Sequence, residues 1–188
     1  MKKSLPTEME AIQAAKAGDQ RAFKRLVEQH ADPVRRTVIS MLGEGPLAED
    51  VAQEVFIRLY RSLGKFQGAA QLGTYLHRVA INLALDTIKQ QKRRRRWQLP
   101  FGKNTELTAK GIADPDVQFE RQDLREGIAK ALRQLTPEFR AVVTLRLVQG
   151  YSVQEAANIL DIPTGTVASR LARAQRKLQE LLRAEGWR

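Results

Sequence analysis

Five polar side chains near the C-terminus recur at helical spacing and could bind an anionic polymer. They are Thr166, Ser169, Arg170, Arg173 and Lys177. Hydroxyl groups donate and accept hydrogen bonds, and guanidinium and ammonium groups pair with phosphate oxygens or with base edges. Residues three or four positions apart lie on one side of a helix, so these groups share a face. The chemistry that they offer is recognition of nucleic acid.

A helix, a tight turn and a second helix are expected to hold this face. Ser152 and Glu155 have the spacing of a capping box, Pro163 keeps Ile162 out of the helical region, and Thr164 is placed to cap the second helix. The pattern predicts a helix-turn-helix, whose second helix lies in the major groove of DNA. A plain helical hairpin with a solvated basic face is the alternative. The second helix has apolar positions at Val167, Leu171, Ala174 and Leu178.

Composition favours the same chemistry. The chain has 188 residues, with 32 basic against 21 acidic side chains, a net charge of +11 and a pI near 10.3. This balance predicts a polyanionic partner. No apolar run approaches a membrane span and the N-terminus lacks the apolar core of a signal peptide, so we expect a cytoplasmic protein without membrane insertion. Without cysteine there is no disulfide, thiolate metal site or thiol switch.

The first part of the chain has helical periodicity with interruptions. Asp19 is placed to cap a helix within residues 7–38, and Asp32 with Pro33 is expected to break the pattern again. A further helix is expected from Pro46, whose fixed backbone angle suits a first helical turn.

Asp50, Gln53 and Glu54 form an acidic and polar face on that helix. Such a face is unusual in a basic protein. The residues alone favour a solvated face whose acids stabilise the start of the helix. Metal binding is not predicted, because two acids on one helix have no histidine partner at ligand spacing.

A long helix beginning at a Thr74 cap carries a second polar face. Cations on such a face can follow phosphates, an aromatic ring can stack on a base, and an amide can hydrogen-bond a base edge, so the mixture suits unpaired DNA. The alternatives are a half-buried core position for Tyr75, an internal hydrogen bond for Asn82 and a frayed basic tail for residues 89–96. The candidate residues are Tyr75, Arg78, Asn82, Lys89 and Arg93.

Residues 97–115 lose periodicity and are rich in Gly, Pro, Asn and Thr, which predicts a flexible linker. It would join two small helical domains, residues 1–96 and residues 116–188, with the helix-turn-helix in the second. No strand pattern of convincing length is present, so the predicted fold class is all-α.

Four segments in this order resemble bacterial RNA polymerase sigma factors of the extracytoplasmic-function group. The first two are AKAGDQRAFKRLVEQH and AEDVAQEVFIRLYRSL, and the last two are TYLHRVAINLALDTIKQQKRR and LTPEFRAVVTLRLVQGYSVQEAANILDIPTGTVASRLARAQRKL. The resemblance covers nearly the whole chain apart from the linker and both ends. It implies a protein that binds core RNA polymerase, recognises and melts promoter DNA, and is masked by an anti-sigma factor. A stress response is the implied setting.

The resemblance also implies roles for the first domain. Asp50, Gln53 and Glu54 would dock on the clamp helices of the large polymerase subunit. The loop over residues 65–73 and the helix after it would open the promoter at its minus-ten element and hold a flipped base. Asn82 matches an asparagine of the family pattern, and Tyr75 stands where the family usually has tryptophan.

In the second domain, the helix from Thr164 would read the minus-thirty-five element. Arg146 matches a family position that contacts DNA, whereas Ala168 stands where the family often has arginine. Loss of one bidentate arginine contact would remove about 1 to 3 kcal/mol and change the preferred sequence. The implied minus-thirty-five residues are Arg146, Thr166, Ser169, Arg170 and Arg173.

Two other functions compete with this interpretation. A stand-alone helix-turn-helix regulator with an N-terminal sensing domain would not need the acidic face or the long basic helix. An enzyme such as a nucleic-acid hydrolase is disfavoured, because His30 and His77 are isolated in the sequence and no glycine-rich phosphate loop follows a strand. We therefore predict no catalytic residues, no metal and no cofactor.

Overall fold

Ten helical segments make up the part of the chain that the computed structural model describes, residues 7–66, 71–97, 118–184 and 186. The first domain contains α1 (Glu8–Lys16), α2 (Gln20–Leu42), α3 (Pro46–Ser62), the 3-10 helix η1 (Leu63–Lys65) and α4 (Leu72–Trp97). The second contains α5 (Gln118–Gln134), α6 (Pro137–Val143), the π-helix η2 (Thr144–Val148), α7 (Val153–Leu160) and α8 (Thr164–Ala184). No strand occurs in these ranges, which confirms the all-α prediction.

The helix α2 is the centre of the first domain and contacts α1, α3 and α4. Asp19 caps it, as predicted, by accepting hydrogen bonds from the backbone N–H groups of Arg21 (2.8 Å) and Ala22 (3.1 Å). The predicted break at Pro33 was wrong, because α2 continues through it. Proline removes one helical hydrogen bond, and packing on both sides offsets that loss.

One apolar core holds the first domain together. Large side chains from α2, α3 and α4 meet there, and Ile12 of α1 closes one end. Burial of these side chains is the main favourable term for a helical bundle of this size. Fully buried members are Leu26, Val34 and Val38 of α2, Val55 and Leu59 of α3, and Leu76 and Ala80 of α4.

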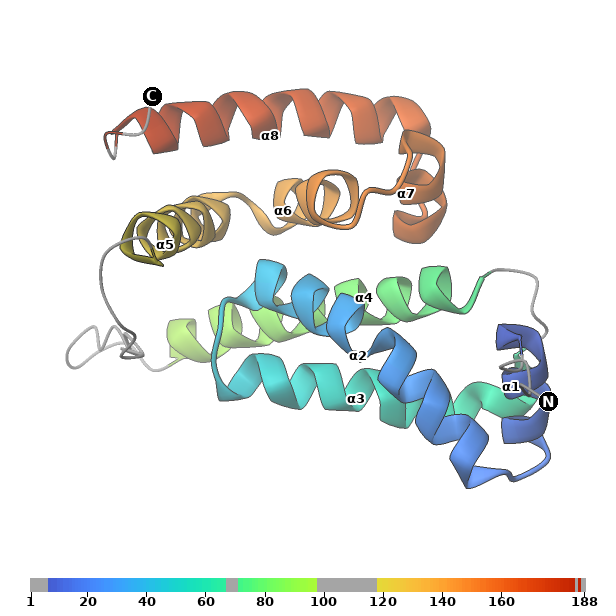
Figure 1. Cartoon of the computed structure of the whole chain (residues 1–188). Coiled ribbons are helices and arrows are strands. Elements are labelled where there is room, and N and C mark those ends of the chain that lie inside the picture. The colour runs from blue at the N-terminus through green and yellow to red at the C-terminus, as the bar shows by residue number, and fades with distance from the viewer. Residues whose placement is uncertain (1–6, 67–70, 98–117, 185, 187–188) are drawn as a thin grey trace.

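A second apolar core joins the two domains. Met41, Ile81 and Ala84 of the first domain pack with buried residues of α6, η2, α7 and α8. Figure 1 shows the result: α5, α6 and α7 lie over α4 and one end of α2, α8 forms the outer edge, and α3 lies on the opposite side. The helix α4 is therefore packed on two sides.

Several predicted boundaries shift by a few residues. The helix α4 begins at Leu72, so Thr74 lies in its first turn and is not its cap, and the predicted loop ends before Gly73. The helix α8 begins at Thr164 itself, where the Pro163 carbonyl accepts from the N–H groups of Thr166 and Val167. Most of the predicted linker lies outside the described residues. No helix within the described ranges is long and apolar enough to span a membrane.

Candidate nucleic-acid and polymerase interfaces

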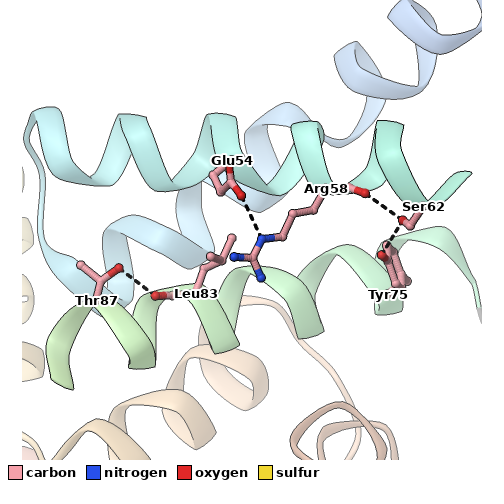
Figure 2. Close-up of polar contacts among 6 residues, drawn as sticks. All are labelled: Glu54, Arg58, Ser62, Tyr75, Leu83 and Thr87. Atoms are coloured by element: carbon pink, nitrogen blue, oxygen red, sulfur yellow. Dashed lines mark hydrogen bonds and ion pairs between the residues drawn. The ribbon is translucent and has the colours of Figure 1, made fainter. Parts of the chain in front are cut away.

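The acidic face predicted on α3 is present at the surface. Asp50 and Gln53 are exposed, and Glu54 is half-buried. The Oε1 atom of Glu54 accepts a hydrogen bond from Nε of Arg58 at 3.0 Å, one helical turn away (Figure 2). Val55 and Leu59 on the opposite side of α3 are buried in the first core, and this packing turns the polar face to solvent. The arrangement presents two carboxylates and an amide to a partner within two turns.

Two large apolar side chains, which the sequence pattern did not predict as part of it, continue this face. Ile57 is 41% exposed and Tyr60 is 66% exposed. Tyr60 contacts Phe23 edge-on at a centroid distance of 5.2 Å, which holds its ring in place. The signal was available, because Ile57 and Tyr60 are four and seven residues after Gln53 and lie outside the buried stripe.

Tyr75 shares a face of α4 with the other minus-ten candidates but is held by residues that precede the helix. It is half-buried, its ring meets Phe66 edge-on at 5.6 Å, and its hydroxyl lies 2.8 Å from Oγ of Ser62 (Figure 2). It also packs against the first core. In this arrangement the ring lies at the junction of α3 and α4 and is half-buried.

The remaining minus-ten candidates form one stripe along α4. Asn82, Lys89 and Arg93 are exposed, and Lys89 pairs with Asp86 at 3.7 Å. Arg78 is exposed too, but its Nη2 donates to the backbone carbonyl of Asn158 in α7. The structure therefore leaves an amide and two cations facing solvent, while the fourth side chain contacts the second domain.

The predicted helix-turn-helix is confirmed as α7 and α8. Ser152 and Glu155 form the capping box: the Ser152 hydroxyl accepts from the Glu155 N–H at 3.2 Å, and the Ser152 N–H donates to the Glu155 carboxylate at 2.7 Å. These hydrogen bonds lower the pKa of Glu155. Asp161 ends α7 in a left-handed conformation with φ of 54°. The turn that follows fixes the direction of α8.

The polar face of α8 points away from the rest of the molecule. Val167 and Ala174 are buried beneath it, while Ser169 and Arg173 are exposed. Thr166 and Arg170 are half-buried, and the Ser169 hydroxyl donates to the Thr166 carbonyl at 3.1 Å. Ala168 is exposed beside them and contributes no polar group. Hydroxyl and guanidinium groups thus face solvent along the first turns of the helix.

Arg146 is only half-buried and its guanidinium turns inward. It donates to the Tyr151 carbonyl, and its Nε is buried without a hydrogen-bond partner in the described residues. Here Arg146 joins η2 to the start of α7, so a DNA contact would need the side chain to turn outward.

The two histidines lie near the junction of the domains. His77 on α4 is buried, lies 2.8 Å from the Thr37 hydroxyl and meets the Tyr151 ring edge-on at 5.3 Å. Burial, with smaller contributions from the charges of His30 and Arg36, lowers the pKa of His77 to about 4. His77 is therefore neutral at physiological pH and has a structural position.

Comparisons with known proteins match both halves of the chain. Family models for sigma-70 region 2 and sigma-70 region 4 match residues 26–94 and 125–178. The chain is 31% identical to the RNA polymerase sigma-H factor of Pseudomonas aeruginosa, covering 94% of this chain and 96% of that protein. It is 32% identical to the ECF RNA polymerase sigma-E factor of Escherichia coli K12, covering 94% and 97%.

Solved structures show the same fold. CnrH in complex with the cytosolic domain of CnrY superposes with a TM-score of 0.69 at 26% identity, covering 94% of this chain and 97% of that one. RpoE of Bartonella quintana, solved with the anti-sigma factor NepR, has a TM-score of 0.67 at 24% identity over 86% and 96% of the two chains. The similarity thus extends over both helical domains.

Proposed function

Because this chain belongs to the extracytoplasmic-function family of RNA polymerase sigma factors, we propose that it binds core RNA polymerase and directs promoter recognition, promoter melting and transcription initiation. The observation that carries the proposal is the combination of the helix-turn-helix of α7 and α8 with the exposed acidic face of α3, which a stand-alone regulator would not need. The protein acts without catalysis of its own, in the cytoplasm, where polymerase and chromosome meet.

Each candidate surface has one part in this function. The face of α3 with Asp50, Gln53 and Glu54 docks on the polymerase, and Ile57 and Tyr60 extend it with apolar area. Charged groups at the rim steer association, while apolar side chains that become buried supply most of the affinity.

The exposed stripe on α4 contacts the minus-ten element of the promoter. Lys89 and Arg93 neutralise phosphates, and the Asn82 amide hydrogen-bonds an unpaired base. Tyr75 stabilises the start of this helix, because its hydroxyl hydrogen-bonds with Ser62 and its ring packs against Phe66. On α8, Ser169, Arg170 and Arg173 contact the minus-thirty-five element. The structure of RpoE with the anti-sigma factor NepR supports a protein inhibitor as a further partner.

Run-off transcription with purified core RNA polymerase over a promoter library tests the function. We expect transcripts that begin at a defined distance from two shared sequence elements. Asp50→Lys with Glu54→Lys should abolish capture of core polymerase, because both carboxylates are replaced by cations. Loss of the Glu54–Arg58 pair costs little, since exposed pairs contribute about 0 to 1 kcal/mol.

A matched control makes the same change in net charge at two acidic residues outside the α3 face. Glu28→Lys with Glu138→Lys alters two exposed acids of α2 and α6 and should leave polymerase capture unchanged. Equal capture by both double variants would remove the docking assignment. A stand-alone regulator, the alternative, would bind duplex DNA tightly without polymerase and would yield no run-off transcript.

A further inference from the structure

A small cavity lies where the C-terminal ends of α2 and α5 meet α4 and α6. Its volume is about 270 Å³. The lining includes three cations, Lys92, Arg133 and Arg140, and the apolar side chains of Leu42 and Ile88. A hollow of this size is near the lower limit of small-molecule sites, and such sites combine apolar walls with a few polar groups. The cavity therefore suits a compact ligand that carries negative charge.

Arg140 is the most buried of the three cations, with only 7% of its surface exposed. Its Nη1 donates to the carbonyl of Met41 and its Nη2 donates to the carbonyls of Arg133 and Leu135. Its Nε is buried and has no hydrogen-bond partner among the described residues. The carbonyls hold the guanidinium in place, but they do not replace the carboxylate that a buried positive charge ordinarily pairs with.

Lys92 of α4 and Arg133 of α5 are exposed and complete the cationic side of the cavity. Gly43 allows Arg133 to lie against the end of α2, because a Cβ at Gly43 would be 3.3 Å from Cδ and 3.4 Å from Nη1 of Arg133. Gly43 also has a φ of 87°, which glycine adopts without strain. Three helices thus bring one cation each to the same cavity.

No acidic side chain of the described residues neutralises these cations. The ion pairs in that part of the chain involve other residues and none of Lys92, Arg133 and Arg140. Burial and, to a smaller extent, the charge of Arg133 lower the pKa of Arg140. The guanidinium groups therefore repel each other, and an anion between them would be attracted by both.

The arrangement of donors favours a phosphate group on a small molecule. Phosphate presents several acceptor oxygens and up to two negative charges, so it can contact cations that approach from different helices, whereas a carboxylate offers two oxygens and one charge. A DNA duplex carries its phosphates on a stiff outer surface and could reach the exposed Lys92 and Arg133 but not the buried Arg140. Leu42 and Ile88, both half-buried, offer apolar area to the rest of the ligand.

We propose that this cavity binds a phosphorylated small molecule, whose phosphate is held by Lys92, Arg133 and Arg140 and whose uncharged part packs against Leu42 and Ile88. The site goes beyond the proposed function, because it uses none of the side chains assigned above to polymerase or promoter. The ligand contacts α2, α4, α5 and α6 together. Its binding therefore stabilises the folded chain against unfolding.

Isothermal titration of the full chain with phenyl phosphate at fixed ionic strength tests the site. We expect one binding site, and Lys92→Gln with Arg133→Gln should weaken binding at least about tenfold, because two charge-assisted contacts are lost. Both changes keep Arg140, whose removal could unfold the chain. Lys24→Gln with Arg25→Gln removes the same charge from exposed residues of α2 and should weaken binding less than about twofold. Equal weakening by both pairs, or no binding to wild type, would overturn the proposal.

Methyl NMR locates the bound ligand. Phenyl phosphate should shift the methyl signals of Leu42 and Ile88 and leave that of Ile57, exposed on α3, unchanged. Inorganic phosphate should bind more weakly, because it has no part that packs on the apolar wall, and equal affinities would contradict the role of Leu42 and Ile88. A short DNA duplex should not displace phenyl phosphate. Displacement would mean that the cations contact the DNA backbone, and the small-molecule site would be wrong.

Discussion

The two candidate DNA-contacting helices differ in how they are held. The helix α4 is buried on two sides, with Leu76 and Ala80 in the first core and Ile81 and Ala84 against the second domain. The helix α8 is buried on one side only. The face of α8 is therefore available whatever the arrangement of the domains. On α4, Asn82, Lys89 and Arg93 are also exposed, and only the candidate Arg78 is held by the second domain through the Asn158 carbonyl.

The largest expected effect tests this difference in burial. Leu76→Ala should lower the free energy of unfolding by about 3 kcal/mol, because Leu76 is fully buried and its truncation leaves a cavity. The matched change Leu178→Ala on α8, where the side chain is half-buried, should cost about 1 kcal/mol. Urea denaturation curves measure both. Equal losses would mean that α8 is packed as tightly as α4.

The next effect depends on pH and is specific to α4. The pKa of His77 is about 4 in the folded protein and about 6.5 when unfolded, so the unfolded state binds more protons below pH 6.5. Stability should therefore fall as the pH drops, by about 2 kcal/mol between pH 7.5 and pH 5. Unfolding measured at both values should show this loss in wild type, and His77→Asn should be less sensitive by that amount.

A pair of polar substitutions distinguishes the roles of the two helices. Asn82→Ala should reduce promoter opening about tenfold with little change in duplex binding, because the amide acts only on an unpaired base. Arg173→Ala should reduce duplex binding about tenfold and lower the salt slope by about one. Permanganate footprinting and filter binding measure the two steps. If both variants lost the same step, the assignment of promoter opening to α4 and of duplex binding to α8 would be wrong.

The smallest effect concerns the helix that supports α8. Ser152→Ala removes one side of the capping box of α7 and should cost about 1 kcal/mol. Thr7→Ala removes the equivalent cap of α1 and should cost a similar amount. Only the Ser152 variant should weaken duplex binding, since α7 positions α8. Weaker binding by the Thr7 variant would point to a general loss of stability.

Local patterns predicted most of the fold and much of the surface. The Ser152 cap, the acidic face at Asp50 and the exposed stripe at Asn82 follow from spacing within a few residues. The second apolar side of α4 was missed, although Ile81, Ala84, Leu85 and Ile88 recur at helical spacing. These positions were expected to belong to a solvent-exposed side of the helix. They are buried because the second domain packs on them.

Burial of polar residues was harder to predict. Arg140 looks like a surface cation, because the carbonyls that satisfy it come from Met41 and Arg133, far apart in sequence. Tyr75 could be assigned either to stacking or to the core, and its contact with Ser62 depends on how α3 and α4 meet. Such side chains depend on tertiary partners that no local pattern contains.

Pro33 has a consequence for the time that the chain needs to fold. The helix α2 runs through it with a trans peptide bond, and the described residues contain no cis bond. In unfolded chains about 10 to 30% of such bonds are cis and return to trans over tens of seconds. Because α2 contacts helices of both domains, a newly made chain with the wrong isomer must wait before either domain can complete its core.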